Sequence, residues 1–449
     1  MSIYADDVIS FTSVLKMSFN FLTGRDYIKK RVQNEKKTLI SVALGFPDLV
    51  FAANAIPVFP IRMEKFKINL YLMALNSATS LFGWDLTTKL LGIAKQLDFL
   101  KIVNNVLDDV IKSINQKYNE MYDLGVQNGV PSDLCYGINA LYGMHKSMGN
   151  VLDANLNFAM RCGEWNKISE SLQTIVPNQI WVNIPPRESE NEEKNLEIMV
   201  NNVKKAISEL ESITGNYITD NSLKKQFRIG NQVKRFYKTI LYEICSSDFY
   251  PCNPATFAEI LALLTISFQD YNSNAQRYLE NMSQLVTEMR ERIKKGIGMD
   301  VSGMPRILIT PMFGGWEPVT HEIIYDLGGR SLYADWDLLG LLEEIHVSEN
   351  SDPIEDYARF LLGASKKGIG CDSDALTNSY LNIVKNLEID GLIINQLFGC
   401  PSISNSYKIL KGKIKSELEV PTIVINFRKI GENVGQVKEQ LGMFMQVFK

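Results

Sequence analysis

Three cysteines stand at positions where an open α/β sheet places its chemistry. Residues 392–394 form a short apolar run that predicts a buried parallel strand, and Cys400 lies just beyond its carboxyl end. Cys162 opens a helix that follows a predicted strand at 151–156, and Cys135 begins a helix in the same part of the chain. Open α/β sheets bind ligands at the carboxyl ends of their strands. Each cysteine alone could be a small buried apolar residue, but together they favour one shared thiolate site.

Thiolates at such a site suit zinc or an iron–sulfur cluster. Structural zinc sites usually contain local CxxC pairs, which this sequence lacks, so widely spaced ligands favour a cluster held between domains. With Ser132 or Asp133 as the helix cap, Cys135 lies in the first turn, where the helix dipole favours thiolate. Cys245 and Cys252 follow no predicted strand and are expected to be structural.

The composition is that of a soluble globular protein with two or three domains. Of 449 residues, 45% are hydrophobic and 22% are charged, and the net charge of −4 includes no basic run that would favour nucleic acid. No uncharged apolar stretch reaches about 18 residues and no signal-peptide pattern opens the chain, so a cytoplasmic location without membrane contact is expected. With only three histidines, a histidine-rich metal site is not expected.

Strands and helices alternate in two parts of the chain, which predicts an α/β fold with two Rossmann- or flavodoxin-like parallel-sheet domains. Strands are predicted at 38–43, 56–59, 151–156, 179–183, 306–310, near 330, at 392–394 and at 422–427. The predicted organisation is a helical arm (1–37), a first α/β domain (38–188) with a helical insertion (about 63–122), a helical section (189–300) and a second α/β domain (301–449). Gly125, Gly129 and Pro131 are expected to end the insertion.

Several motifs resemble a known family. They are "DLCYGINALYGM", the "IWVNIPPR" strand, "RILITPMFGGWEPVTHEIIYDLGG" and "DGLIINQLFGC" with "VPTIVINF". In order and context they resemble subunits of the 2-hydroxyacyl-CoA dehydratase and benzoyl-CoA reductase family, from about residue 38 to the end, with the reductase large subunit closest around Cys135 and Cys400. The resemblance implies that Cys135, Cys162 and Cys400 hold a [4Fe–4S] cluster, with Cys371 as a fourth or alternative ligand.

The resemblance also implies an enzyme, an oxidoreductase or lyase, that works as a heteromer in anaerobic metabolism. A separate ATP-hydrolysing iron–sulfur activator would supply low-potential single electrons, which this subunit would pass to an acyl-CoA thioester. The sequence contains no GxxxxGK[ST] loop and so no P-loop of its own. A related second cluster-bearing subunit is the expected partner, contacting the helical arm 1–36 and the insertion near Trp84.

The sequence departs from the dehydratase pattern at two positions. Dehydratases of this family carry a carboxylate after the second proline of the "IPVFP" stretch and a serine in the loop before it, whereas this chain has Ile61 and "ALGFP". We therefore favour the reductase of an aromatic or unsaturated thioester, with a radical 2-hydroxyacyl-CoA dehydratase as the alternative. An electron-carrier or scaffold subunit, or an α/β binding protein with core cysteines, are further alternatives.

The substrate is expected in a crevice between the domains, beside Cys400. Its walls would be the loops "ALGFPDL", "FGGWEP" and "CPSISNS". Small polar side chains there are expected to bind the thioester or a cluster-bound water: Ser402, Ser404 and Asn405. Trp316 would pack on the acyl or aryl group, and His321 would donate a proton. Alternatively, Trp316 is a core residue and His321 a surface residue at a helix start.

Overall fold

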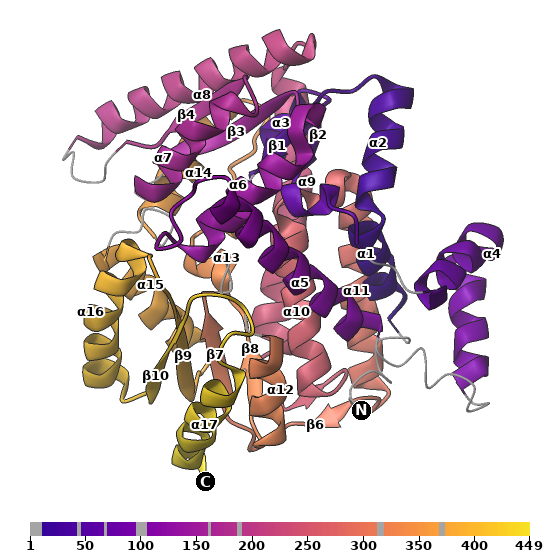
Figure 1. Ribbon diagram of the computed structural model, residues 1–449, viewed down its shortest axis with the longest axis vertical. Helices are drawn as coiled ribbons and strands as arrows, with labels where there is room; N and C mark the ends of the chain where they lie inside the picture. Colours follow the sequence, from indigo (N-terminus) through magenta and orange to yellow (C-terminus); the bar gives the residue numbers. More distant parts are fainter. Residues whose placement is uncertain are drawn as a thin grey trace.

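Two four-stranded parallel sheets form the framework of the chain (Figure 1). The computed structural model describes residues 11–42, 46–66, 70–95, 106–159, 163–185, 191–311, 318–367 and 373–449. The first sheet has the order β2-β1-β3-β4 and the second β10-β9-β7-β8. Their strands are β1 (Leu39–Val42), β2 (Ile56–Val58), β3 (Ala154–Ala159), β4 (Gln179–Asn183), β7 (Arg306–Thr310), β8 (Arg330–Leu332), β9 (Gly391–Leu397) and β10 (Thr422–Phe427). The predicted α/β fold with two parallel sheets is confirmed.

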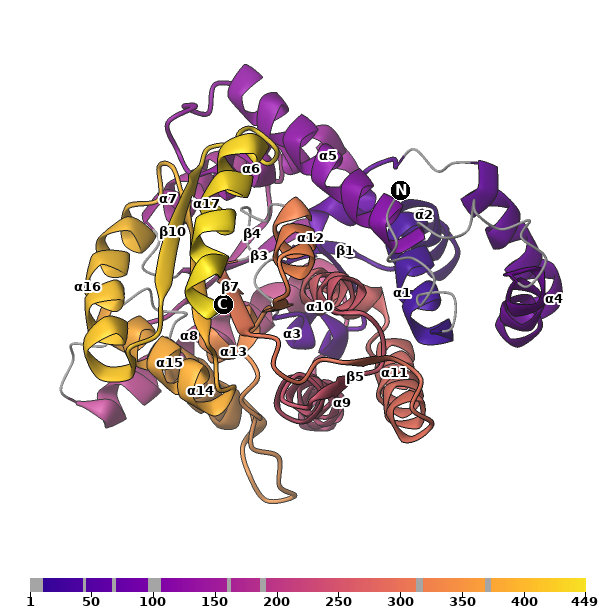
Figure 2. The same cartoon turned by 90° about the horizontal axis from the view of Figure 1, so that it is seen from below.

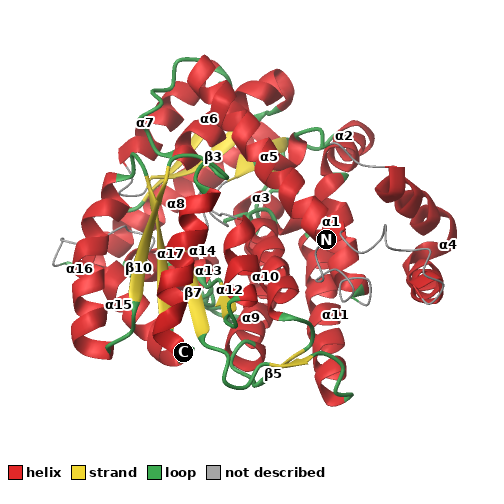
Figure 3. Cartoon of the chain, turned by 60° about the horizontal axis from the view of Figure 1, so that its bottom comes forward, coloured by secondary structure: helices red, strands yellow, loops and turns green. Residues whose placement is uncertain are grey.

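The strands at the centre of each sheet are buried on both faces. Every residue of β1 and β7 is buried, and β9 is buried except at Gln396. Helices cover the sheets, so the inner strands are nearly continuous apolar runs without the alternation of a half-exposed strand (Figure 3). A short antiparallel pair, β5 (Phe249–Tyr250) and β6 (Met299–Asp300), lies apart from both sheets.

Helices make up most of the rest of the described chain. They are α1 (Thr12–Leu22), α2 (Gly24–Glu35), α3 (Asp48–Ala52), α4 (Leu70–Lys95), α5 (Val106–Gln127), α6 (Tyr136–Met148), α7 (Gly163–Ser171), α8 (Glu192–Thr214), α9 (Asp220–Thr239), α10 (Pro254–Phe268), α11 (Ala275–Lys294), α12 (Pro318–Asp326), α13 (Asp335–Leu338), α14 (Pro353–Ser365), α15 (Ser373–Asn386), α16 (Pro401–Leu418) and α17 (Val434–Met445). Every residue of α10 is buried, which makes it the central helix of the core (Figure 2). No described helix has the length and hydropathy needed to span a bilayer.

The N-terminal helical segment is part of the protein core. α1 buries most of its residues against α10, α11, α4 and α5 of its own chain. The predicted insertion contains two separate helices in its described part, α4 and α5, and α4 is kinked at Gly83, whose φ is 75°. Trp84 packs edge-on against Phe19 of α1, with ring centroids 5.5 Å apart. α4 packs on α1, with Leu75 buried in the core, and projects from the body of the molecule (Figure 1).

α5 and α6 approach each other at two glycines. A Cβ built on Gly143 would overlap the carbonyl oxygen of Met121, and one built on Gly125 would overlap that of Asn139. Gly125 was expected to end the preceding helix, but it lies inside α5, which continues to Gln127. The sequence prediction was wrong here because this glycine allows close helix packing and does not serve as a turn residue.

Candidate functional site

The two sheets have one topological switch point each. In the first sheet, the chain leaves β1 for β2 on one side and later enters β3 on the other side of β1. In the second sheet, β7 is flanked in the same way by β8 and β9. Ligands of open α/β sheets bind where the strand order reverses, at the carboxyl ends of the strands. Cys162 follows β3 and Cys400 follows β9 in the sequence, so both cysteines come after a switch-point strand.

Cys135 and Cys400 lie together, joined by a hydrogen bond between their side chains. Cys135 is the N-cap of α6 and Cys400 the N-cap of α16. The contact depends on Gly399, whose φ is +75°, because a Cβ there would lie 2.7 Å from the carbonyl carbon of Leu134 and 2.9 Å from the nitrogen of Cys135. The loop after β9 therefore packs directly on the backbone that leads into α6.

The groups around Cys135 shift the pKa of its thiol in opposite directions. The hydrogen bond with Cys400, followed by burial, raises the pKa of Cys135 well above its usual value, while the backbone N–H groups of Gly137 and Ile138 lower that pKa. The helix N-terminus was expected to favour thiolate, but the neighbouring sulfur outweighs it. Cys135, expected in the first turn behind Ser132 or Asp133, is itself the cap residue. Two adjacent sulfurs of this kind are better suited to bind one cation together than to provide a single reactive nucleophile.

The other two candidate ligands, Cys162 and Cys371, lie outside the described residues. The helices that follow them are described. Trp165 of α7 belongs to the same apolar cluster as Cys135. α15 begins two residues after Cys371, and the hydroxyl of its first residue lies 3.0 Å from the Ser406 hydroxyl on α16. The helices after both cysteines thus pack beside the helices that Cys135 and Cys400 cap.

The structure describes the residues predicted for the substrate site to different extents. Trp316 lies outside the described residues, and the backbone of Ser402, Ser404 and Asn405 belongs to the first turns of α16. His321 lies on α12 with 2% of its surface exposed, so the surface alternative was wrong. Its Nδ1 is 3.4 Å from the Tyr333 hydroxyl, and its Nε2 is 3.6 Å from Oε1 of Glu259.

Two residues near these sites were not predicted, although the sequence around each of them is distinctive. Glu259 is the one ionisable residue within the apolar helix "PATFAEILALLTISF", which marks it as a buried charge. Gly399 directly precedes Cys400, and a glycine before a helix cap indicates a left-handed residue or a close backbone contact, both of which occur here. Cys245 and Cys252, predicted to be structural, are both fully buried in the core.

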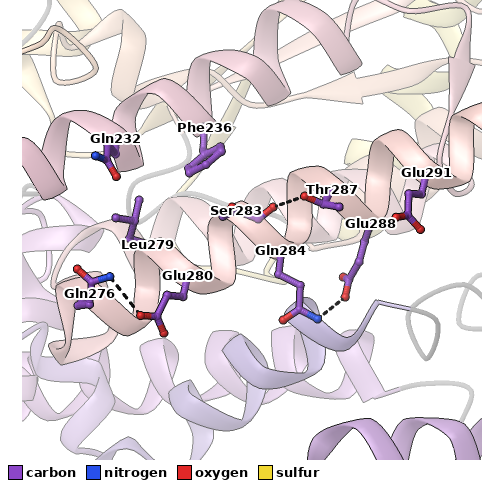
Figure 4. A pocket seen from close by; sticks show the side chains of 10 residues that line it. All are labelled: Gln232, Phe236, Gln276, Leu279, Glu280, Ser283, Gln284, Thr287, Glu288 and Glu291. Atoms are coloured by element: carbon purple, nitrogen blue, oxygen red, sulfur yellow. Dashed lines mark hydrogen bonds between the residues drawn. The ribbon is translucent and has the colours of Figure 1, made fainter.

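Two surface grooves of about 530 Å³ are lined by described residues, and neither includes a cysteine. One lies between α9 and α11, where polar side chains of α11 bond to one another along the helix, including Gln276 to Glu280 and Gln284 to Glu288 (Figure 4). The other is lined by Tyr242, by residues of α13 and α15 and by three lysines, of which Lys367 is paired with Glu343. Several polar groups of each groove bond to one another, and both grooves lie away from the pair of thiols formed by Cys135 and Cys400, called the thiol pair below.

The fold and the site define an α/β protein with two parallel sheets and a thiol pair at two helix N-termini. Residues 97–448 match the family model described as "2-hydroxyglutaryl-CoA dehydratase, D-component", and the chain belongs to this family. The resemblance seen in the sequence is thereby confirmed, and the chain is a 2-hydroxyacyl-CoA dehydratase-type subunit. A search of curated proteins gives no significant match. β1, β2 and α4 precede the matched region.

Proposed function

We propose that this chain is the cluster-holding subunit of an acyl-CoA enzyme, with Cys135, Cys162 and Cys400 as ligands of a [4Fe–4S] cluster and Cys371 as a fourth or alternative ligand. The observation that carries the proposal is the contact between Cys135 and Cys400 at two helix N-termini. When bound, such a cluster supplies single low-potential electrons, received from a separate ATP-driven activator, to a CoA thioester.

The side chains and backbone around the thiol pair fit a thiolate-ligated cluster. Gly137 and Ile138 direct backbone N–H groups at the sulfur of Cys135, and hydrogen bonds to sulfur tune the potential of iron–sulfur centres. The N-termini of α6 and α16 favour negative charge on both sulfurs. Cys400 is only 9% exposed, so its surroundings exclude most water. These residues would hold the group and protect it from solvent.

The reaction we favour is reduction of an aromatic or unsaturated thioester. Ile61, at the position of the dehydratase carboxylate, is fully buried in the main core, and Arg62 beside it is paired with Asp270 in the interior. Residue 61 itself therefore offers no carboxylate at that position. A radical 2-hydroxyacyl-CoA dehydratase is the second candidate, supported by the family description, with the carboxylate supplied by another subunit. An electron-carrier subunit is the third.

The substrate would bind beside Cys400, with Ser402, Ser404 and Asn405 at the thioester and Trp316 at the acyl group. A related second subunit would bind α4, because α1 is already covered by its own chain. α4 exposes large apolar side chains, at Met73, Leu81, Phe82, Leu86 and Leu90. Charged replacements of Leu81 and Phe82, the two next to the Gly83 kink, should abolish co-purification of the second subunit, and retained co-purification would reject this contact.

The cluster is tested by iron and sulfide analysis of protein purified without oxygen. Cys135→Ser and Cys400→Ser should each lose most of the roughly four irons per chain of the wild type. Cys245→Ser is the matched control and should keep the iron, because this buried cysteine lies near Arg306 and Arg330, where β7 and β8 begin, whereas Cys400 follows the carboxyl end of β9. Full iron content in both Cys135→Ser and Cys400→Ser would reject the ligand set.

The reaction type is tested with the assembled enzyme, the activator and a measured supply of reductant. Benzoyl-CoA and 2-hydroxyglutaryl-CoA serve as the two probes. Reduction consumes electrons in proportion to product, whereas dehydration is redox-neutral and turns over many times per electron. Product from benzoyl-CoA with matching electron consumption supports the reductase. Product from 2-hydroxyglutaryl-CoA with little consumption supports the dehydratase and rejects the argument from Ile61.

A further inference from the structure

A second group of metal-ligating side chains lies on α10 and α12. Glu259 of α10 is 4% exposed, and His321 of α12 is buried as deeply. Glu322, the next residue of α12, is half-buried. One ligand atom from each residue lies within 4.8 Å of the other two. α10 and α12 pack side by side, so this triad joins the central helix to the helix that follows β7 (Figure 2).

The charges of the triad favour a cation. A carboxylate in the interior loses several kcal/mol of hydration, about the size of a whole domain's stability margin, unless partners compensate it. Two carboxylates this close also repel each other, which favours either a shared proton or a bound cation. A divalent ion with a neutral imidazole would balance both negative charges.

The separation of His321 and Glu259 matches that of two ligands of one metal ion. Two ligands at 2.0–2.2 Å from a tetrahedral zinc are about 3.3–3.6 Å apart, and His321 Nε2 lies 3.6 Å from Glu259 Oε1. The other ring nitrogen, Nδ1, lies 3.4 Å from the hydroxyl of Tyr333. A histidine that binds a metal usually has its second nitrogen held by a neighbouring polar group, which fixes the tautomer and the ring orientation.

We propose that Glu259, His321 and Glu322 bind a divalent transition-metal ion, with Zn²⁺ preferred. One imidazole and two carboxylates form a nitrogen and oxygen donor set that suits zinc, and three protein ligands leave a fourth position for water. The ion would fix α12 on α10, beside the second switch point. Bound in this way, Nε2 of His321 cannot donate a proton, so the ligand role and the proton-donor role predicted from the sequence exclude each other.

The test is zinc binding by the full-length protein with its cluster intact, measured by dialysis against zinc chloride and elemental analysis. The wild type should bind about one zinc per chain. His321→Gln and Glu259→Gln should each weaken zinc binding by at least about 100-fold, and Tyr333→Phe by about 10- to 100-fold. Iron content should stay unchanged in all three variants. His145→Gln is the matched control, because it replaces another buried histidine far along the sequence, on α6, and should keep the zinc.

A second measurement separates this site from the thiol pair. The double variant Cys135→Ser/Cys400→Ser should keep its zinc whether or not it loses iron, so this proposal and the cluster proposal can fail independently. Cobalt bound to the wild type should show visible bands of nitrogen and oxygen ligation without a thiolate charge-transfer band, a result that needs no folded variant. Absence of zinc from the wild type, zinc retained in both triad variants, or a thiolate band would overturn the proposal.

Discussion

Gly399→Ala would disturb the close backbone contact between the loop that carries Cys400 and the segment that leads into Cys135. The residue has a φ of +75°, and the Cβ of alanine would overlap the carbonyl oxygen of Asp133. It would also lie 2.7 Å from the carbonyl carbon of Leu134 and 2.9 Å from the nitrogen of Cys135. All three neighbours are backbone atoms, so no side chain can rotate away to make room. The loop after β9 must then separate from the loop before α6.

The size of the effect follows from two contributions. A non-glycine residue in the left-handed region costs about 1–2 kcal/mol. Overpacking of a well-filled interior costs a further 1–3 kcal/mol, roughly, because contacts below about 3.5 Å must be relieved by moving the backbone. The sum predicts a loss of roughly 2–5 kcal/mol in the free energy of unfolding. The hydrogen bond between the two thiols should break as well.

The assay is urea unfolding followed by tryptophan fluorescence, with iron content measured on the same preparations. Gly412→Ala on the same helix, α16, is the matched control, since Gly412 is exposed and a Cβ there meets no atom within 4 Å. It should stabilise the protein by about 0.5–1 kcal/mol, because alanine favours the helix. If the free energy of unfolding of Gly399→Ala lies within about 0.5 kcal/mol of the wild-type value and its iron is intact, the predicted backbone clash is refuted.

Three further substitutions test helix packing and buried polar groups in the interior. Gly143→Ala should lower the free energy of unfolding by about 1–3 kcal/mol in urea, because its Cβ overlaps α5. Gly363→Ala is its control and should not lower it, because a Cβ there meets no atom within 4 Å. Arg62→Leu should cost about 3–5 kcal/mol in the same assay by leaving Asp270 buried without the 2.6 Å ion pair, and adding Asp270→Asn should recover part of the loss. Burial lowers the pKa of His145 from 6.5 to about 4, so below pH 6.5 the unfolded chain binds the extra proton. Between pH 7 and 4.5, the wild type should therefore lose about 2–3 kcal/mol more stability than His145→Gln.

The strands were predictable where the local sequence decides them. The runs at 179–183, 306–310 and 422–427 coincide with β4, β7 and β10, because each is a short apolar or β-branched segment between breaking residues. β3 begins three residues later than predicted, at Ala154, because Val151 belongs to a 3₁₀ turn despite its β-branched side chain. β9 extends through Asn395 and Gln396, where pairing with β10 outweighs the polar side chains.

The site was less predictable, because it depends on contacts between distant segments. Periodicity places Cys135 and Cys400 at helix starts, but their pairing depends on how the second sheet docks on α5 and α6. The loop after β10 bonds to α5 through Lys429 and Asp123, 2.7 Å apart, and the Ile430 carbonyl oxygen accepts a hydrogen bond from the side chain of Asn119. The Glu259 triad likewise requires α10 to lie beside α12. No local pattern specifies such docking.

The thiol pair makes the junction between the two halves of the chain part of the candidate site. Cys135 comes from the part that carries the first sheet, and Cys400 from the second sheet. Phe46, after β1, stacks on Phe158 of β3 at 4.1 Å and also contacts Phe360 of α14, so the core is continuous across this junction. A group bound to both thiols must therefore stabilise the junction, by about 2.7 kcal/mol at a ligand concentration 100 times the Kd. Loosening the junction must weaken binding by the same free energy, because the two equilibria are linked.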